Sequence, residues 1–271
     1  MKKIKIVRPL SMALAGEPKT GKSTIGAMII KKYGGLFLDL GRVNQSGGMD
    51  GSTVKYSVDL QHSYEKNGEI IKEVGESWTA VSKNGIEDQY RLILNWKDFE
   101  NVIAEANVLS EDVLQKKIWL VIDDTVAWRK HKVLDVKDKL GHKSATKNDW
   151  GIATQELNLL TSKLSKTFNL FLICQMSDEY QTFDSSDENG KSKSKEKSGI
   201  RAPLWIPSGL DYLVDGMIHI EIDKTVRPYK QYLVIDGGRE VWVCDENFSP
   251  KVDKITPELI MKVMGISEDR L

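Results

Sequence analysis

The chain has 271 residues, 40% of them hydrophobic, which is enough for a core in one large α/β domain or two modest ones. Its 39 Lys and Arg balance its 39 Asp and Glu, so any polyanion site must be a local patch rather than a global field. No stretch approaches the roughly 18 uninterrupted apolar residues of a membrane span, and no signal-peptide apolar region follows the basic N-terminus. We therefore expect no membrane partner.

Both cysteines, Cys174 and Cys244, lie in apolar, strand-like runs, where cysteine usually serves as a small core residue. This usage fits a reduced environment better than a secreted one. We therefore expect the protein in the cytoplasm.

Residues 16–23 read GEPKTGKS and match the phosphate-binding pattern G-x-x-x-x-G-K-[ST]. An apolar run at 11–15 precedes them as a plausible buried strand, and a helix is predicted from 23 to 32, stopped by Gly34 and Gly35. The alternative is a chance glycine-rich turn, which the strand and helix on either side disfavour. The candidate nucleotide-binding residues are Gly16, Glu17, Pro18, Lys19, Thr20, Gly21, Lys22, Ser23 and Thr24.

In this pattern the backbone N–H groups cradle phosphates, Lys22 reaches the β- and γ-phosphates, and the Ser23 hydroxyl holds Mg²⁺. The apolar run at 118–122 ends in Asp123 and Asp124, the Walker B signature of a strand that places an acid on the magnesium. Asp123 is the predicted metal partner of Ser23. Asp124 is a candidate to orient or deprotonate the attacking water, or alternatively the cap of the next helix.

Asp39 ends an earlier apolar strand, at 36–42. Since ligands of parallel sheets lie at the carboxyl ends of the strands, Asp39 either faces the nucleotide or belongs to an ordinary strand-end turn. Gln175 likewise ends the apolar run 169–175, where its amide suits a γ-phosphate sensor; a simple turn glutamine is the alternative. We therefore take Lys22, Asp39, Asp124 and Gln175 as the catalytic candidates.

Residues 44–88 alternate apolar and polar positions and contain two Asn-Gly hairpin signals, at 67–68 and 84–85. They predict a small antiparallel insertion at the edge of the sheet. A strand at 90–96 follows, and then a helix with one apolar face formed by Phe99, Val102, Ile103 and Ala106.

Residues 126–149 carry seven Lys and Arg against three Asp, between Trp128 and Trp150. Basic residues next to aromatic ones suit a nucleic-acid backbone with base stacking, although a solvated helix and loop is the simpler alternative. Asp149 is the expected cap of a helix that runs to about residue 167.

Residues 177–200 are poor in apolar side chains, and we expect them to form a mobile loop without secondary structure. Their lysines alternate with serines, which suits phosphate contacts, although the acids cancel the charge and a solvated tether is the alternative. The candidate DNA-binding residues of the two segments are Arg129, Lys130, Lys132, Lys191, Lys193 and Lys195.

A strand is predicted at 213–222, then a hairpin from 231 to 244, and a helix that begins at Pro257 and stops at Gly265. His219 has apolar neighbours and is expected to be a core or edge histidine rather than a catalyst. The basic connection at 224–230 is a weaker candidate for a residue that reaches a neighbouring subunit's nucleotide.

With these features in this order, the chain resembles the RecA-like core over residues 10–245, and more narrowly the phage and prophage nucleotide-binding proteins that include single-strand annealing recombinases. The resemblance implies an α/β fold with a mainly parallel central sheet flanked by helices, here with a β-rich insertion and a C-terminal β-hairpin. It implies one domain over residues 1–245 and a helical tail over 246–271. A usual RecA-like glutamate is replaced by Gly41, which predicts slow hydrolysis.

The function that follows from the resemblance is an ATPase that binds Mg²⁺ and single-stranded DNA and anneals or pairs strands, in the host cytoplasm if the chain is phage-encoded. A homo-oligomer and a single-strand DNA-binding protein are the expected partners. The alternatives are a nucleotide-dependent protein switch or a partition- or packaging-type ATPase that does not act on DNA, and a small-molecule kinase, against which no Arg-rich lid is evident.

Overall fold

The computed structural model describes residues 9–18, 20–40, 59–66, 69–76, 89–112, 118–187, 190–204, 206–223, 225, 230–237, 251–252 and 255–263. Its helices are α1 (Lys22–Tyr33), α2 (Trp96–Asp112), α3 (Thr125–Lys139), α4 (Lys147–Thr167) and α5 (Pro257–Val263), with a 3₁₀ turn at Leu210–Tyr212. Its strands are β1 (Ser11–Gly16), β2 (Gly35–Asp39), β3 (Asp59–Lys66), β4 (Glu69–Glu76), β5 (Tyr90–Leu92), β6 (Trp119–Asp123), β7 (Asn169–Ile173), β8 (Gln175–Asp187), β9 (Gly190–Leu204), β10 (Gly216–Asp223), β11 (Lys230–Gly237) and β12 (Lys251–Val252).

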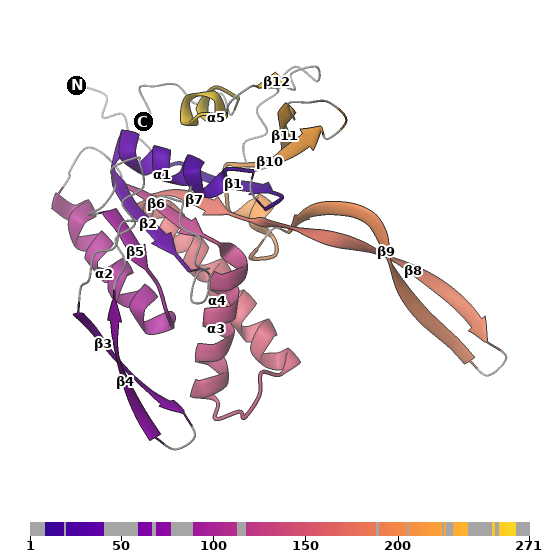
Figure 1. Cartoon of the computed structure of the whole chain (residues 1–271), viewed down its shortest axis with the longest axis horizontal. Helices are drawn as coiled ribbons and strands as arrows, with labels where there is room; N and C mark the ends of the chain where they lie inside the picture. The colour runs from indigo at the N-terminus through magenta and orange to yellow at the C-terminus, as the bar shows by residue number, and fades with distance from the viewer. Residues whose placement is uncertain are drawn as a thin grey trace, which may run out of the picture.

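The centre of the fold is an eight-stranded sheet in the order β12-β11-β10-β1-β7-β6-β2-β5 (Figure 1). The strands from β10 to β5 run parallel to one another, and β11 and β12 are antiparallel additions at one edge. The predicted mainly parallel α/β sheet is confirmed. Because β1 lies between β10 and β7, the strand that leads into the phosphate-loop pattern is an inner strand, protected from solvent on both edges.

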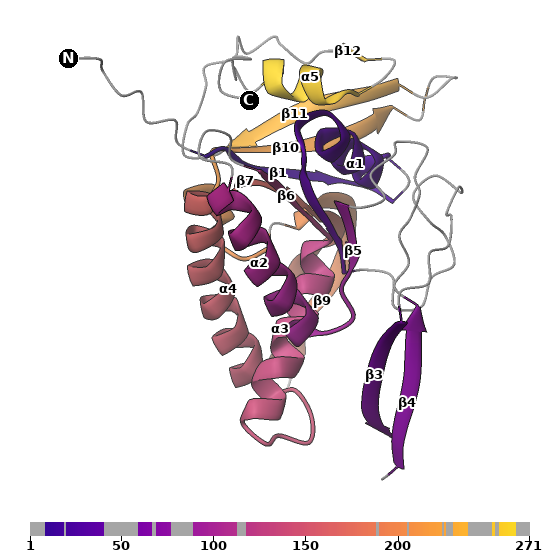
Figure 2. The same cartoon turned by 90° about the vertical axis from the view of Figure 1, so that its left-hand side faces the viewer.

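Helices cover both faces of this sheet (Figure 2). Helices α1 and α5 pack on one face through Ile29, Ile30, Ile260 and Met261, and α2, α3 and α4 pack on the other. Helix α1 lies unusually close to the strands, since a Cβ added at Gly26 would come within 2.9 Å of Val121 Cγ1. This covering explains why the inner strands have apolar residues at consecutive positions rather than only at alternate ones.

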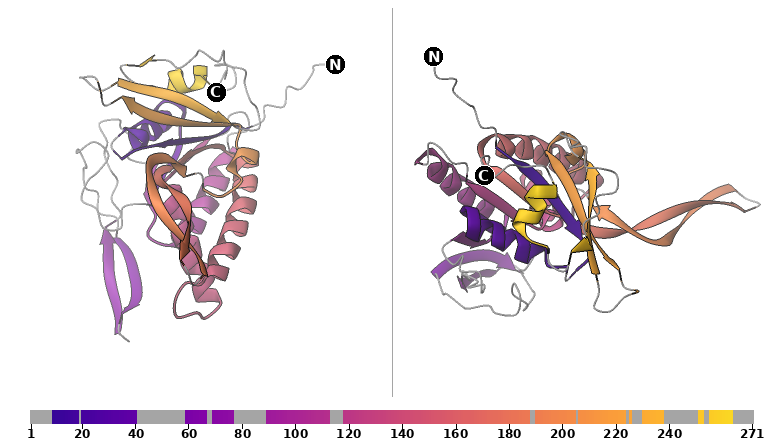
Figure 3. Two further views of the ribbon diagram at one scale, coloured as in Figure 1. Left: turned by 90° about the vertical axis from the view of Figure 1, so that its right-hand side faces the viewer. Right: turned by 90° about the horizontal axis from the view of Figure 1, so that it is seen from above.

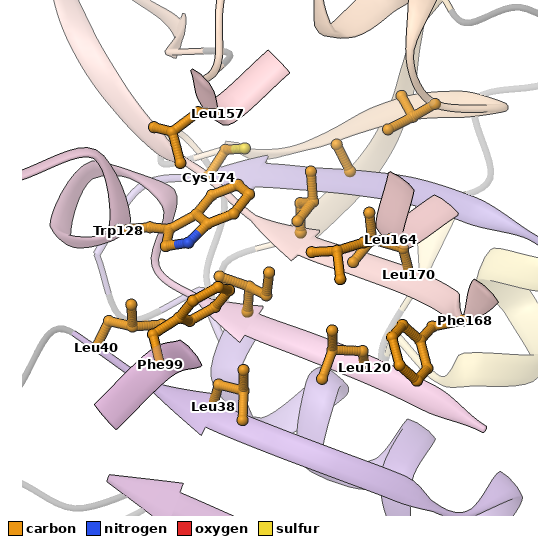
Figure 4. Packing of buried hydrophobic residues seen from close by; sticks show 14 of the residues in the cluster. Leu38, Leu40, Phe99, Leu120, Trp128, Leu157, Leu164, Phe168, Leu170 and Cys174 are labelled. Carbon is orange, nitrogen blue, oxygen red and sulfur yellow. The ribbon is translucent and has the colours of Figure 1, made fainter. Parts of the chain in front are cut away.

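The core between the sheet and helices α2–α4 is built around aromatic side chains (Figure 4). The rings of Phe99 and Trp128 lie 5.7 Å apart, and both side chains are fully buried. The predicted apolar face of α2 is confirmed, but Trp128 belongs to this core. Only Trp150, of the two tryptophans that flank the basic segment, is partly exposed.

Helix α4 starts two residues before the expected cap. Its N-cap is Thr146, whose hydroxyl accepts from the Asp149 N–H at 3.3 Å, while the Asp149 carboxylate accepts from the Thr146 N–H at 2.7 Å. Asp149, the expected cap, is instead the third residue of the helix. In a capping box the cap lies three residues before that acid.

Residues 59–66 and 69–76 form the antiparallel pair β3–β4, in which Lys66 lies opposite Glu69, so the paired strands end on either side of the Asn-Gly signal at 67–68. The pair forms a sheet of its own rather than an edge of the central sheet. The second signal, at 84–85, lies outside the described residues.

The segment expected to lack secondary structure instead forms the long antiparallel hairpin β8–β9, which extends away from the sheet (Figures 1 and 3). Low apolar content does not prevent this, because the two strands satisfy each other's backbone hydrogen bonds. The ladder closes with Asp187 opposite Gly190.

The C-terminal part is confirmed where it is described. Strand β11 pairs antiparallel with β10, and α5 begins at Pro257 with the Thr256 hydroxyl accepting from the Leu259 N–H at 3.3 Å. The expected hairpin arm at 241–244 and the stop at Gly265 lie outside the described residues. Among the helices described, none has the length and apolar character needed to cross a bilayer.

Candidate nucleotide-binding site

The phosphate-loop pattern lies where the sequence places it, between the C-terminal end of β1 and the start of α1. Gly21 has φ +87°, a left-handed conformation that favours glycine, and it immediately precedes α1. At the other end of the loop, a Cβ on Gly16 would come within 2.9 Å of Thr20 Oγ1. Glycine is therefore favoured at Gly21 by the backbone conformation and at Gly16 by the close approach of the Thr20 side chain.

The N-terminus of α1 is open to a ligand. Within the described residues, no side chain accepts a hydrogen bond from its first-turn N–H groups, and its first turn holds no acid. Unpaired N–H groups and the helix dipole together favour an anion at this position. The Thr20 hydroxyl donates instead to the Glu17 carbonyl at 2.9 Å, which holds the loop closed on itself.

Lys22 is folded over this loop. Its ammonium donates to the carbonyls of Gly16 and Glu17, each at 2.7 Å. Burial lowers the pKa of Lys22, and the charges of Asp123 and Asp124 oppose that shift. The loop lysine and the two Walker B acids therefore share one electrostatic environment at the carboxyl ends of β1 and β6.

Asp123 is the last residue of β6 and is largely buried, 9% exposed. Ser23, in the first turn of α1, is half-buried. A hydroxyl and a carboxylate are the hard oxygen donors that Mg²⁺ prefers, so these two residues fit the predicted metal site. Thr24 follows in the same helical turn, whereas Lys19 of the loop lies outside the described residues.

Asp39 lies in register with Asp123 across the β2–β6 pairing, but β2 is separated from β1 by two strands. Its carboxylate is 1% exposed and accepts from the Tyr90 hydroxyl at 2.5 Å. This contact anchors β5 to β2. The catalytic role of Asp39 stays a prediction, as does the effect of Gly41, which lies outside the described residues.

Asp124 caps helix α3, as the alternative interpretation predicted. Its Oδ1 accepts from the Ala127 N–H at 2.8 Å, and its Oδ2 accepts from Gln175 Nε2 at 2.5 Å. Gln175 is not the end of β7 but the first residue of β8, after the buried Cys174. The base of the long hairpin is therefore hydrogen-bonded to the residue that follows the Walker B acid.

Cys174 adds a second link at this point that the sequence did not indicate. The Thr125 hydroxyl donates to its sulfur at 3.4 Å, and burial raises the pKa of Cys174 to about 11, so it is a protonated core thiol. Its predicted core position is confirmed. On the far side of the loop, Gln231 Nε2 of β11 donates to the Thr20 carbonyl at 3.4 Å, a contact that no local sequence pattern signals.

Of the two expected places for His219, core or edge, the structure shows the core: it is buried on β10, an inner strand between β1 and β11. Its Nδ1 lies 2.7 Å from Asp236 Oδ2 and its Nε2 lies 3.1 Å from Glu221 Oε1. Burial acts to lower the pKa of His219, but the two carboxylates outweigh it and the net pKa is raised. The contact with Asp236 therefore joins the His219 side chain on β10 to the neighbouring strand β11.

The basic residues of α3 differ in whether their side chains are available to bind a DNA phosphate. Lys130 is exposed, and the guanidinium of Arg129 lies 5.0 Å from the ring of Trp150. Lys132 is only 5% exposed, and its ammonium bonds Asp135 at 2.9 Å and Glu156 at 2.6 Å. A DNA phosphate would have to displace those carboxylates, so we leave Lys132 out of the proposed surface.

The hairpin separates charges that the sequence mixes. Residues opposite each other across an antiparallel ladder share a face, and so do residues two apart along a strand. The register pairs Ser186 with Lys191, Asp184 with Lys193, Thr182 with Lys195, and Tyr180 with Lys197. Four lysines therefore fall on one face with a single acid, while Glu196 and Asp187 fall on the other.

Comparison with solved structures finds 22 chains that resemble this one in fold. No family model matches the chain, and no curated protein matches it in sequence. A KaiC-like protein, PH0186, from the hyperthermophilic archaeon Pyrococcus horikoshii OT3 matches 85% of this chain and 80% of its own, with 14% identity and a TM-score of 0.43. A likeness this distant carries no argument about function.

The order of the parallel strands in the central sheet identifies the fold. Numbered along the chain, the five strands β1, β2, β6, β7 and β10 lie in the spatial order 5-1-4-3-2, with the phosphate loop following the first. The chain has a RecA-like P-loop core. The narrower resemblance, to phage annealing proteins, stays a prediction.

Proposed function

We propose that this protein is a RecA-like ATPase that binds ATP with Mg²⁺ and, in its ATP-bound form, binds single-stranded DNA and promotes annealing or pairing of strands. The observation that carries the proposal is the loop at residues 16–23, with Gly21 at φ +87° before an uncapped helix and Lys22 beside two carboxylates. These groups are complementary to a phosphate chain with a divalent cation.

Each part of the site has a role in this proposal. Lys22 exchanges its bonds to the Gly16 and Glu17 carbonyls for bonds to phosphate oxygens, while Ser23 and Asp123 hold the magnesium, which neutralises charge on the phosphates. Asp124 lies close enough to Lys22 to influence its pKa, which suits a residue that orients the attacking water. Since Asp39 is engaged with Tyr90, we expect slow hydrolysis.

DNA binding is assigned to the hairpin face that carries Lys191, Lys193, Lys195 and Lys197, together with Lys130 of α3. Alternate residues of a strand lie about 6.8 Å apart, so these four lysine positions recur at an even spacing along one strand. Such a row suits a polyphosphate backbone without sequence preference. A homo-oligomer and a single-strand DNA-binding protein are the proposed partners.

The nucleotide site is tested by ATP binding to Lys22→Ala, with Lys31→Ala as control. Lys31 is an exposed residue near the other end of the same helix, so its loss removes the same charge without touching the loop. We expect Lys22→Ala to weaken binding of a fluorescent ATP analogue by about 100-fold, since two or more charge-assisted hydrogen bonds are lost. Equal affinity in the two variants would refute the assigned site.

DNA binding is tested by anisotropy of a labelled single-stranded oligonucleotide, with and without Mg-ATP. A Lys191→Ala, Lys193→Ala, Lys195→Ala triple variant is compared with a triple variant of the exposed Lys31, Lys163 and Lys166. Losing three phosphate contacts lowers the slope of log affinity against log salt by about 2. The control should match wild type. If wild type binds ATP but no oligonucleotide, the DNA function is refuted and the protein is a nucleotide-dependent switch.

A further inference from the structure

We infer that the β8–β9 hairpin joins copies of this chain: the outer edge of β9 in one copy pairs with the outer edge of β8 in the next, in an intermolecular sheet. This pairing is the interface of the homo-oligomer proposed above, and it depends on that part of the proposed function rather than on the ATP site. Two features carry it, the open edges of the hairpin and the opposite charges of its strands.

Both long edges of the hairpin are open to a further strand. Among the described residues, β8 (13 residues) and β9 (15 residues) form a sheet with each other alone, and this ribbon extends away from the rest of the molecule (Figures 1 and 3). An unpaired strand edge presents a row of backbone N–H and C=O groups to which another strand can bond. Since an isolated two-stranded ribbon is only marginally stable in water, a third strand would stabilise it.

The two strands of the hairpin carry opposite charge. Strand β8 has four acidic residues and no basic one, whereas β9 has five basic residues and one acid, so the formal charge is −4 on β8 and +4 on β9. The acids of β8 are Asp178, Glu179, Asp184 and Asp187, and the basic residues of β9 are Lys191, Lys193, Lys195, Lys197 and Arg201.

The hairpin's own ladder matches only part of this charge. Two of the basic residues, Lys193 and Arg201, lie opposite an acid across the ladder. The other three, Lys191, Lys195 and Lys197, lie opposite uncharged residues. An acidic strand on the other side of β9 would therefore supply cross-strand partners that the hairpin itself does not place directly opposite them.

The charges also select the strand that fits each open edge. Two β8 edges, or two β9 edges, would bring like charges together, which destabilises a strand pair, whereas β9 beside β8 brings opposite charges together. DNA has no peptide backbone to continue the ladder, and its phosphates would be repelled by β8. The partner that matches both edges, in backbone and in charge, is a second copy of the same hairpin.

Such a contact has consequences for the assembly. Each copy uses its β9 edge toward one neighbour and its β8 edge toward the other, so the interface is heterologous and repeats into a ring or a filament. Pairing through the edges leaves both faces of the sheet open. It therefore does not compete with the lysine face assigned to DNA.

The first test is sedimentation velocity of the full chain at low salt, with and without Mg-ATP. The triple variant Lys191→Glu, Lys195→Glu, Lys197→Glu makes β9 acidic without placing like charges directly opposite each other inside the hairpin. We expect its self-association to be at least about tenfold weaker, since opposite charges between copies become like charges. The same change at the exposed Lys31, Lys163 and Lys166 is the matched control and should assemble as wild type does.

The second test needs no substitution in the hairpin. Carbodiimide couples a lysine amine to a carboxylate that touches it. In an equal mixture of isotope-labelled and unlabelled wild type, a cross-linked peptide pair that contains one labelled and one unlabelled member joins two copies. We expect such mixed pairs between the lysines of β9 and the acids of β8.

The outcomes are distinct. If wild type stays monomeric with and without Mg-ATP, both this interface and the proposed homo-oligomer fail, whatever ATP and DNA binding show. If wild type assembles but the β9 triple variant assembles equally well, the hairpin interface is overturned while the homo-oligomer stands. Mixed cross-links found only outside the hairpin would overturn it in the same way.

Discussion

The N-termini of helices α1 and α4 are built in opposite ways. Helix α4 is closed by its own sequence: Thr146 and Asp149 bond each other's backbone N–H groups, and His142 adds a contact to the Asp149 carboxylate at 2.9 Å. Helix α1 begins after Gly21, with no side-chain cap among the described residues and no acid in its first turn. Among the described residues, side chains accept from the N-terminal backbone of α4 but not from that of α1.

The two helix ends therefore contribute differently to folding stability and to ligand binding. A capped terminus contributes to folding stability in every state of the protein. An uncapped terminus leaves its N–H groups and the positive end of its dipole to a ligand, so its stabilisation arrives only with the anion. Helix α3 combines both roles, since Asp124 caps it and also holds Gln175.

The largest effect on ATP affinity is expected from a substitution that places a carboxylate at the N-terminus of α1. Gly21→Asp places a negative charge where the phosphates bind and should weaken ATP binding by more than about 100-fold in a fluorescence titration, since the lost anion contacts are charge-assisted. Gly34→Asp is the matched control. Gly34 ends the same helix with φ +82°, and no described atom lies within 4 Å of a Cβ built at either glycine.

Both substitutions put a non-glycine residue at positive φ: Gly21 has ψ 11°, in the left-handed helical region, whereas Gly34 has ψ 163°, a region that is almost confined to glycine. Both should therefore lower the midpoint of thermal unfolding, Gly34→Asp by at least as much as Gly21→Asp. Only Gly21→Asp should lose nucleotide affinity. If Gly34→Asp lost it equally, the effect would come from destabilisation, and the contrast between the two helix ends would not hold.

A smaller effect, on folding stability, is expected from removing the N-cap of α4. Thr146→Ala removes the N-cap of α4 and should lower the free energy of unfolding by about 1 kcal/mol, which corresponds to about 2–4 °C in the unfolding midpoint of a chain this size. Calorimetry measures it. Nucleotide affinity should be unchanged, and Ser144→Ala, in the exposed turn just before the cap, should behave as wild type. A change in ATP binding would contradict the division of roles.

The smallest effect is one of pH. The backbone N–H of Thr146, and after it the contact with His142, hold the pKa of Asp149 below its ordinary value of 3.8. A lowered pKa in the folded state stabilises the fold above the unfolded-state value, and the contribution disappears as pH falls through the folded-state value. The stability difference between wild type and Asp149→Asn, measured by urea unfolding, should therefore shrink from pH 7 to pH 3. A difference that grew toward acid would contradict the assigned hydrogen bonds.

Patterns that are local in sequence predicted much of this protein. The phosphate loop, the buried strand ending in Asp123 and the apolar face of α2 each depend on residues within a few turns or one strand of one another. The pairing of β3 with β4 on either side of the Asn-Gly signal at 67–68 was predictable for the same reason. The long hairpin β8–β9 was missed because low apolar content was taken as evidence against strands, although strands that pair with each other satisfy their backbone groups without burial.

The amino-acid sequence by itself determined the phosphate site, because backbone conformation at Gly16 and Gly21 and the chemistry of Lys22 and Ser23 are properties of eight consecutive residues. Only the tertiary structure decided which distant groups meet there. Strand order places Gln175 beside Asp124, 51 positions away, and pairing register gathers alternate lysines on one hairpin face. The physical reason is that hydrogen-bond partners and shared faces are set by which strands pair and in what register, and a single strand read alone contains neither.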